Sequence, residues 1–376
     1  MKILYILHTA KLHGSSISLL NIILNINKGI IPIIVIPNSK NDELIKILVH
    51  HNIKFYRCHF IPLSYINRNL PLFKKFFSIG KIFLKKVLFF PFLYWVILKE
   101  KPSIIHTNVG VIYEGYKLAR ILNIPHVWHI REYQDKDFNW NFFYGKNVFE
   151  KMLKNSYVIC ITKDIRNYFN LNNKESQTIY NGIYYYNSIA LEKKDKYYLC
   201  ASKIAPNKGQ EDAIKAFAKF HETHQDWKLI IAGEGDKSYV NRLKDLSQSL
   251  NCQGSIEFIG FQNTESIFNL MKKAAGLIVA SQNEGFGRMT AEACFAGTMI
   301  IGRYTGGTKE ILDMIEGYRF LTESELEKAM IQVSKEINTT CYNQKIKNSQ
   351  KIAQESFSIE QNTAKIFNLY KNIKHE

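Results

Sequence analysis

The sequence has few cysteines and no metal-binding pattern built from them. Its six cysteines are scattered, with no Cys-x-x-Cys pair and no histidine cluster at zinc spacing. Most of them stand in apolar segments, so we expect buried, reduced thiols. The first ten residues lack the long apolar core and cleavage site of a secretory signal, so we expect a cytoplasmic protein.

No apolar run is long enough to cross a membrane. In the most apolar region, residues 70–101, the longest charge-free stretch covers residues 87–98 and contains Pro91, whereas a spanning helix needs roughly 20 residues. Two interpretations remain open. The region is either a basic amphipathic segment lying on an anionic membrane surface, or two core-facing helices with solvated lysines. The many aromatic residues beside lysines favour the first.

Acidic residues are scarce relative to basic ones. The chain has 50 lysines and arginines against 33 aspartates and glutamates, a formal net charge of +17. Such a surplus predicts a phosphate-bearing ligand, nucleic acid or an anionic lipid surface as partner. The chain contains no recognisable nucleic-acid-binding module, and its aromatic residues cluster with aliphatic ones, so we do not expect nucleic-acid binding.

What the sequence does contain is a regular alternation of apolar strands and amphipathic helices. Near-continuous apolar runs, such as residues 31–37 and 228–232, predict parallel sheets covered on both faces, the doubly wound α/β fold. The alternation weakens at the polar residues 184–196. We therefore predict two Rossmann-like domains, residues 1–185 and 186–355, facing each other across a ligand-binding cleft.

The strongest functional signal is SQNEGFGRMTAEACFAGTMIIG at residues 281–302. A predicted strand leads into a glycine-containing loop, and a helix follows from near Arg288 to a left-handed cap at Gly297. Glycines and a helix amino end allow backbone amides to approach a diphosphate. Glu284 and Glu292 then make sense as acceptors for sugar and ribose hydroxyls. The alternative is an ordinary helix acid and an exposed loop acid.

Basic side chains follow other predicted strands. Lys203 and Lys208 stand between a strand and a helix, where two ammonium groups can neutralise a diphosphate and stabilise a leaving group. His129 and Arg131 end a strand near residue 130 and are predicted to face the cleft, although a lone histidine is more often structural. Gly14 follows the first strand, but no G-x-G-x-x-G fingerprint for a nicotinamide cofactor accompanies it.

Asp135 and Asp137 form a D-x-D pattern. Two such carboxylates can hold a metal ion against a nucleotide diphosphate. Here they follow no nucleotide-binding turn and stand among solvated residues. We therefore interpret them as surface residues and predict no metal site.

Taken together, these motifs resemble glycosyltransferase family 4, retaining enzymes of the GT-B fold. The resemblance is strongest from Tyr197 to Leu312, and it includes the Lys208-Gly209 turn, IIAGEGD, IEFIGF, the Glu284-to-Glu292 spacing and GGTKEIL. The amino-terminal half matches more loosely, through IIHTN, WHIRE, VICITKDI and IYNGI. Residues 356–376 resemble the family's closing helix, which crosses back onto the amino-terminal domain.

The resemblance implies a role for each matching residue. Lys203 and Lys208 would contact the donor diphosphate, and Gly14 would approach it from the other domain. His129 would meet the donor sugar near the reacting carbon. The implied catalytic residues are His129 and Glu284, and the implied donor-binding residues are Gly14, Arg131, Lys203, Lys208, Glu284, Gly285, Phe286, Gly287 and Glu292.

Two departures from the family pattern stand out. Lys203 occupies a position where the family usually has arginine, so a bidentate phosphate fork becomes a point charge. His13 precedes Gly14 where the family usually has paired glycines, which leaves the donor's approach to this loop less defined.

The implied activity is metal-independent hexosyl transfer with retained anomeric configuration. The donor is a UDP- or GDP-sugar acting as co-substrate, without a cofactor. The acceptor is a saccharide or lipid-linked sugar in bacterial surface-polysaccharide synthesis, which predicts a peripheral position on the inner face of the cytoplasmic membrane. Two alternatives remain open: a nucleotide-sugar epimerase of the same fold and a non-catalytic sugar-nucleotide-binding subunit.

Overall fold

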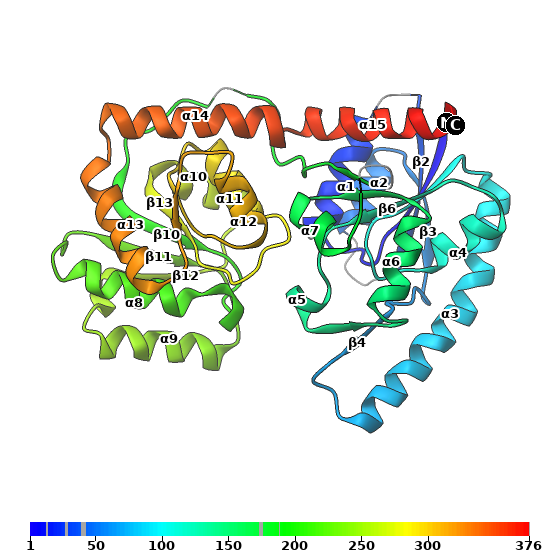
Figure 1. The fold of residues 1–376 in the computed structure, drawn as a ribbon, viewed down its shortest axis with the longest axis horizontal. Coiled ribbons are helices and arrows are strands. Elements are labelled where there is room, and N and C mark those ends of the chain that lie inside the picture. Colours follow the sequence, from blue (N-terminus) through cyan, green and yellow to red (C-terminus); the bar gives the residue numbers. More distant parts are fainter. Residues whose placement is uncertain (13, 27–28, 39–42, 173–175, 188, 376) are drawn as a thin grey trace. The chain divides into compact units, whose positions relative to one another are not determined.

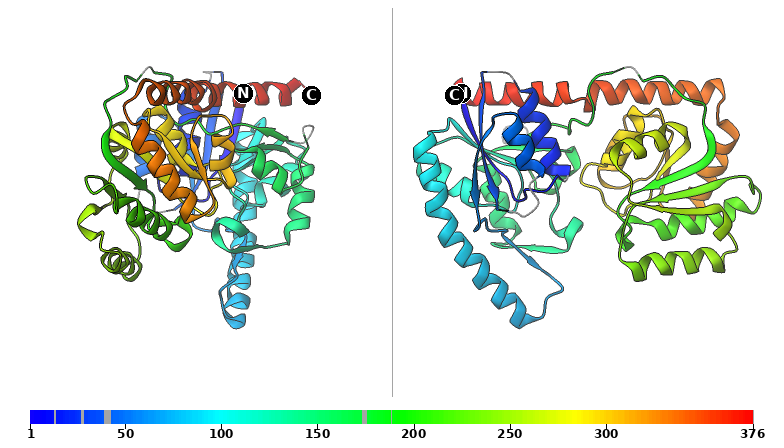
Figure 2. Two further views of the ribbon diagram at one scale, coloured as in Figure 1. Left: turned by 60° about the vertical axis from the view of Figure 1, so that its left-hand side comes forward. Right: turned by 180° about the vertical axis from the view of Figure 1, so that it is seen from behind.

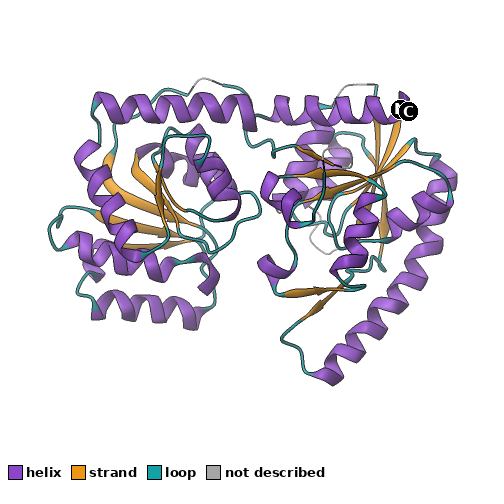
Figure 3. Cartoon of the chain, viewed as in Figure 1, coloured by secondary structure: helices purple, strands orange, loops and turns teal. Residues whose placement is uncertain are grey.

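A computed structural model describes residues 1–12, 14–26, 29–38, 43–172, 176–187 and 189–375. The chain divides into two compact units (Figure 1). Unit 1 comprises Met1–Gly182 and Ile359–Glu376, and unit 2 comprises Ile183–Ser358. The boundaries predicted after residues 185 and 355 differ from these by three residues. Each unit contains a parallel sheet with helices packed against it (Figure 3).

Unit 1 contains these elements in the described ranges. Its strands are β1 (Lys2–Ile6), β2 (Ile31–Pro37), β3 (Lys54–Cys58), β4 (Tyr65–Asn67), β5 (Ile104–Thr107), β6 (His126–Ile130), β7 (Trp140–Phe142), β8 (Tyr157–Cys160) and β9 (Ser176–Thr178). Its helices are α1 (Gly14–Asn25), α2 (Glu43–His50), α3 (Leu72–Glu100), α4 (Glu114–Ile121), α5 (Asp135–Phe138), α6 (Lys146–Lys154), α7 (Lys163–Tyr168) and α15 (Ile359–His375).

Unit 2 contains the remaining elements. Its strands are β10 (Asp195–Ala201), β11 (Lys228–Ala232), β12 (Ile256–Gly260), β13 (Ala274–Val279), β14 (Ile300–Arg303) and β15 (Tyr318–Phe320). Its helices are η1 (Pro206–Lys208), α8 (Gln210–His221), α9 (Lys237–Ser249), η2 (Gln253–Ser255), α10 (Thr264–Lys273), α11 (Arg288–Phe295), α12 (Gly306–Leu312), α13 (Glu323–Glu336) and α14 (Thr340–Phe357).

The unit 1 sheet is buried on both faces. Its strand order is β3-β2-β1-β5-β6-β8-β9, all parallel. Along β1, Ile3 and Tyr5 enter a cluster with α1, α2 and α15, whereas Leu4 and Ile6 enter a second cluster with α3 and α4. Because successive side chains of a strand point to opposite faces, a strand buried on both sides must be apolar throughout. This explains why the continuous apolar runs of the sequence predicted a parallel sheet covered on both faces.

The last helix, α15, belongs to unit 1. It packs on α1, and its apolar side chains enter the same core cluster as β1. The Tyr370 hydroxyl lies 2.7 Å from Nδ1 of His106, and Asn362 Nδ2 donates to the carbonyl oxygen of Tyr180. The return of the chain's end to the first unit confirms the fold expected from the sequence.

The unit 2 sheet has the strand order β12-β11-β10-β13-β14-β15. Counted along the chain this is 3-2-1-4-5-6, the order of a dinucleotide-binding sheet, and the predicted doubly wound α/β class is confirmed. One apolar cluster, which includes Tyr198, Phe217 and Met330, joins the sheet to α8 and α13. Loops that leave β10 and β13 therefore start at neighbouring strands where the strand order reverses.

The structure of region 70–101 contradicts one of the two interpretations of its sequence. Most of it forms one continuous 29-residue helix, α3, which contains Pro91. The prediction of two core-facing helices with solvated lysines is wrong, because the helix is single and Lys86 is buried beside Glu114. None of the helices in the described ranges is long and apolar enough to cross a membrane.

The cysteines are thiols in the described residues. Five are buried, and Cys341 on α14 is exposed. The prediction that most of them are buried is confirmed, because the parallel strands and helices that carry most of them form the two cores.

Candidate functional site

The predicted donor residues of unit 2 come together at one edge of its sheet. Lys203 and Lys208 follow β10, and residues 284–287 follow β13, its neighbour at the point where strand order reverses. Ligands of doubly wound sheets bind outside the carboxyl ends of the strands at this point. The fold thus places residues separated by more than seventy positions on one site.

A close ion pair marks this site. The Nζ atom of Lys208 lies 2.5 Å from Oε1 of Glu284, and each side chain is about 24% exposed. Lys203 is exposed in the turn after β10, and its backbone oxygen accepts a hydrogen bond from Nε2 of Gln210. The two opposite charges neutralise each other, and both side chains are partly exposed to solvent, so a ligand can contact them.

Two glycines allow the loops of this site to approach one another. Gly209 has φ +71°, and a Cβ there would stand 2.1 Å from the carbonyl oxygen of Ala280. A Cβ on Gly307 would stand 2.4 Å from the carbonyl group of Phe286, and the Gly307 N–H donates to the Glu284 carbonyl oxygen at 2.7 Å. Only glycine fits these contacts, so the turns after β10, β13 and β14 form one connected surface.

Glu292 lies on α11 with a cation beside it. Its side chain is 3% exposed, and Nε of Arg288 lies 2.6 Å from its Oε1. Burial raises the pKa of Glu292, and the Arg288 guanidinium opposes this rise. Gly287, with φ +83°, directly precedes the helix, and the predicted left-handed Gly297 ends it with φ +67°. Sequence reasoning assigned no role to Arg288, although its i, i+4 spacing to Glu292 is the signal for such a pair.

In unit 1, Arg131 is the centre of a buried polar network. Its Nε and Nη2 atoms donate to Oδ1 of Asn108, and its Nη1 atom donates to Ser18 and Asn181. These partners come from α1 and from loops after β5 and β9. The guanidinium therefore joins three segments of unit 1 through hydrogen bonds. The donor contact predicted for Arg131 stays a prediction, since these protein oxygens occupy its donors in this structure.

His129 is fully buried beside this network. Its Nδ1 atom lies 3.3 Å from Nη2 of Arg131, and its Nε2 atom has no hydrogen-bond partner within the described part of the chain. Burial, with a smaller contribution from the charge of Arg131, lowers the pKa of His129 well below its usual value. The imidazole is therefore neutral at physiological pH.

Glu132 is next to Arg131 in the sequence, and its pKa is raised, whereas that of His129 is lowered. Burial, together with the nearby Asp137, raises the pKa of Glu132 to about 7, and Arg131 opposes the rise. A carboxyl whose pKa is higher in the folded than in the unfolded chain costs stability once it must ionise. This cost is absent below the ordinary pKa of about 4.5, grows as the pH rises to about 7, and is constant above.

Replacement of Glu132 by glutamine is therefore expected to stabilise unit 1, more at pH 8 than at pH 6. The gain at pH 8 should be about 1–3 kcal/mol after allowance for partial solvent contact. Urea unfolding at both pH values measures it. Glu43→Gln, at an exposed position, should change stability by only a few tenths of a kcal/mol. A gain in stability at pH 8 that is equal to or smaller than the gain at pH 6 would contradict the raised pKa of Glu132.

Two other predicted features lie at the same end of unit 1. Gly14 begins α1, and a Cβ there would meet no atom within 4 Å, so its predicted approach to the diphosphate stays a prediction. His13 lies outside the described residues. Asp135 accepts from the Tyr168 hydroxyl at 2.6 Å and Asp137 from the Tyr133 N–H at 2.7 Å. Within the described ranges no three His, Cys, Asp or Glu side chains form a group suited to a metal ion.

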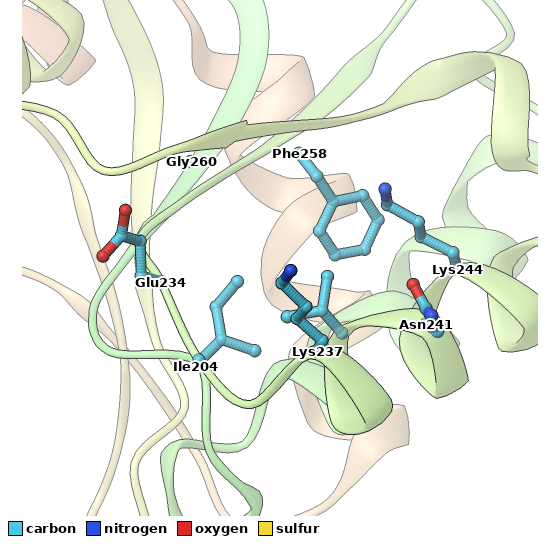
Figure 4. A pocket seen from close by; sticks show the side chains of 10 residues that line it. Ile204, Glu234, Lys237, Asn241, Lys244, Phe258 and Gly260 are labelled. Carbon is cyan, nitrogen blue, oxygen red and sulfur yellow. The ribbon is translucent and has the colours of Figure 1, made fainter.

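A pocket of about 570 Å³ lies beside the unit 2 site (Figure 4). Lys237 and Lys244 of α9 line it together with Phe258 of β12, Glu234 after β11 and Ile204 after β10. None of the predicted donor residues lines this pocket, although Ile204 directly follows Lys203. The pocket is a separate space at the carboxyl ends of β10, β11 and β12, adjoining the edge where Lys208 and Glu284 meet.

Most of unit 2 matches a known family model. Residues 186–351 match the family model of "Glycosyl transferases group 1". Unit 2 is similar to the group 1 glycosyl transferases. An uncharacterized glycosyltransferase of Methanocaldococcus jannaschii is 30% identical over 174 residues, 41% of this chain and 44% of that protein. The alpha-monoglucosyldiacylglycerol synthase of Streptococcus pneumoniae is 27% identical over 145 residues, 38% of this chain and 32% of that protein. The chain thus spans less than half the length of these curated relatives.

The whole chain is similar in fold to a solved structure. Anabaena HepE, crystallised in complex with UDP and glucose, superposes with a TM-score of 0.72 over 99% of this chain and 100% of its own, at 18% identity. This likeness shows the fold. The match to the group 1 family model covers residues 186–351 and therefore concerns unit 2 alone.

The structure adds residues that the sequence did not single out. In unit 1 these are Ser18, Asn108 and Asn181, which bond to Arg131, and Tyr370, which bonds to His106. Asn108 ends the motif IIHTN and Asn181 lies within IYNGI, so their positions after strands were a usable signal. Nothing in the local sequence around residue 370 indicates a contact with His106, because the two lie 264 positions apart.

Proposed function

We propose that this chain is a retaining, metal-independent glycosyltransferase of family 4. It transfers a hexosyl group from a UDP- or GDP-sugar to a saccharide or lipid-linked acceptor in bacterial surface-polysaccharide synthesis. It acts in the cytoplasm, on the inner face of the cytoplasmic membrane. The nucleotide sugar is a co-substrate, and no cofactor takes part.

One observation carries the proposal: Lys208 and Glu284 meet at the switch point of the unit 2 sheet. A cation and a carboxylate at this position suit the two ends of a nucleotide diphosphate sugar, since the phosphates need positive charge and the sugar hydroxyls need acceptors. The buried Glu292 offers a second acceptor for the ribose. Lys203 adds a further cation at the same strand end.

The proposed chemistry assigns these groups as follows. The bond between the sugar's anomeric carbon and the diphosphate oxygen breaks, and the acceptor hydroxyl attacks from the same face. The acceptor's proton passes to the departing phosphate oxygen. Lys208 and Lys203 stabilise the charge of the leaving diphosphate, the role that a metal ion has in other transferases. Glu284 and the neutral His129 are the proposed catalytic side chains that bind the donor sugar.

The acceptor and the location are supported by charge and by one relative. A net charge of +17 favours a surface rich in phosphate. The matched Streptococcus pneumoniae protein is named for synthesis of a glucosyl lipid. Both fit an acceptor carried on a lipid.

A nucleotide panel tests the donor site. UDP or GDP is expected to stabilise the protein with or without EDTA, whereas CMP is not. A ligand at 100 times its dissociation constant adds about 2.7 kcal/mol, which a thermal melt detects. Lys208→Met should lose this response, and Lys219→Met, at an exposed position of α8, should keep it.

Each contrary result has a defined meaning. Stabilisation that requires magnesium or manganese would contradict metal independence. It would favour a metal site at Asp135 and Asp137. No response to any nucleotide would favour the non-catalytic alternative. Conversion of the nucleotide sugar without an acceptor would favour the epimerase.

A further inference from the structure

The two halves of α3 have different surroundings within unit 1. In the carboxyl-terminal half, Phe89, Leu93 and Val96 are fully buried in the core cluster that contains β1 and α4. In the amino-terminal half, large apolar side chains face solvent: Phe76 is 74% exposed, Phe77 78% and Phe83 63%. This half extends beyond the rest of unit 1 in every view (Figures 1 and 2).

The exposed apolar residues of α3 share one side of the helix. On a helix with 3.6 residues per turn they fall within an arc of about 160°, on the side away from the core-facing residues. This set comprises Leu72, Phe73, Phe76, Phe77, Phe83, Leu84, Val87, Leu88, Tyr94, Trp95 and Leu98. We call it the apolar face of α3. An exposed apolar surface of this extent is unusual on a soluble protein and marks an interaction site.

The charges along α3 have one sign. Lys74, Lys81 and Lys85 project along one border of the apolar face, and neither they nor Lys75 have an ion-pair partner among the residues the structure describes. No acidic residue occurs from Leu72 to Lys99. The helix's first acid, Glu100, is buried and bonded to Lys54. An apolar face bordered by unpaired lysines is complementary to a surface that is anionic outside and apolar beneath.

A buried contact fixes the rotation of α3 about its own axis. The Nζ atom of Lys86 lies 2.9 Å from Oε1 of Glu114 and 2.6 Å from Oγ of Ser64. The rings of Tyr113 and Tyr144 also lie within about 5.1 Å of it. Turning the apolar face toward the core would bury other charges and break these contacts. The face is therefore held toward solvent by the fold.

We infer that the apolar face of α3 inserts into the headgroup region of an anionic lipid bilayer. The phenylalanines enter the boundary between headgroups and acyl chains, the lysines extend to the lipid phosphates, and the helix lies in the plane of the membrane. This inference deepens the proposed function, because it names the surface that would hold the enzyme near a lipid-linked acceptor. The binding itself does not depend on transferase activity.

Vesicle sedimentation with the full chain tests this inference. The probes are phosphatidylcholine vesicles and vesicles that contain about one third phosphatidylglycerol. The chain is expected to bind the anionic vesicles at least tenfold more tightly, and less tightly as salt rises. The triple variant Phe76→Ser, Phe77→Ser, Phe83→Ser should lose binding. Ile121→Ser with Leu321→Ser, which removes exposed apolar residues elsewhere, should retain it.

A second set of variants separates charge from apolar contact. Replacing Lys74, Lys81 and Lys85 by glutamine should weaken binding to anionic vesicles about 100-fold, since each lysine near such a surface contributes about fivefold. Glutamine at Lys151 and Lys154, exposed on α6, should have little effect. Because these lysines are not buried, the variants keep the test valid if the phenylalanine variant does not fold.

Three results would overturn the inference. They are absence of binding to any vesicle, equal binding to neutral and anionic vesicles, and unchanged binding by both sets of variants. Self-association that the phenylalanine variant abolishes, without vesicle binding, would assign the face to a second copy of the chain. The nucleotide response of the same preparations tells the two proposals apart. Its loss with vesicle binding intact would count only against the transferase, and the reverse only against the membrane contact.

Discussion

Replacing Lys208 by methionine is expected to lower kcat/KM for sugar transfer at least 100-fold. Its ammonium group stands at the carboxyl end of β10, 2.5 Å from Glu284, where the charge of the leaving diphosphate would develop. Removing one preorganised group that stabilises such charge typically costs about 100- to 1,000-fold in rate. Initial rates of sugar transfer, with the donor selected by the nucleotide panel, measure the effect.

Two further variants make this test specific. Lys208→Arg keeps the positive charge and should recover part of the activity, whereas Lys219→Met should behave as the wild type. Because Lys208→Met leaves the Glu284 carboxylate without its cation, thermal melts must show that the variant is folded. A folded Lys208→Met protein with less than threefold loss would exclude Lys208 from the site.

Acidification below pH 6.5 is expected to destabilise unit 1 strongly. His106, His126 and His129 are buried, and burial lowers the pKa of His126 to about 3 and those of the other two well below the usual value. Groups with a lowered pKa in the folded chain give stability that is present above the unfolded pKa, about 6.5, and is lost as the pH falls below it. Each then costs about 1.4 kcal/mol per pH unit.

The net loss should be about 3 kcal/mol per pH unit, since Glu132 offsets part of the histidine effect between pH 7 and 4.5. This is large against a typical total stability of 5–15 kcal/mol. Urea unfolding at pH 7.5, 6.5 and 5.5 measures the slope. His126→Asn should reduce it by about half, whereas His51→Asn, at an exposed position, should not change it. Stability that stays constant or rises from pH 7.5 to 5.5 would contradict the prediction.

The candidate site was predictable from sequence only in part, for a local reason. The turns after β10 and β13 are short segments in which glycines, lysines and acids follow apolar strands, and that pattern is visible in the sequence. The pairing of Lys208 with Glu284 depends on β10 and β13 being neighbours, which the order of strands along the chain does not reveal. The partners of Arg131 depend on three segments meeting, so the sequence predicted the arginine but not its network.

The short edge elements were missed for a related reason. The strand β9 and the antiparallel pair of β4 with β7 are only three residues long each, too short to show a period. Strands buried on both faces are recognisable because every position is apolar. A short edge strand is held by its neighbour's backbone and leaves no such pattern.

The sequence by itself determined the doubly wound class, the two sheets and the residues that end their central strands, since burial on both faces requires continuous apolar runs. Tertiary structure alone decided which of those ends meet and how α3 is turned. Lys86 looks in the sequence like any other lysine of a basic helix, yet Glu114 and the surrounding rings bury it. That contact fixes which side of α3 faces solvent, because the charge environment of a side chain depends on residues brought together by folding.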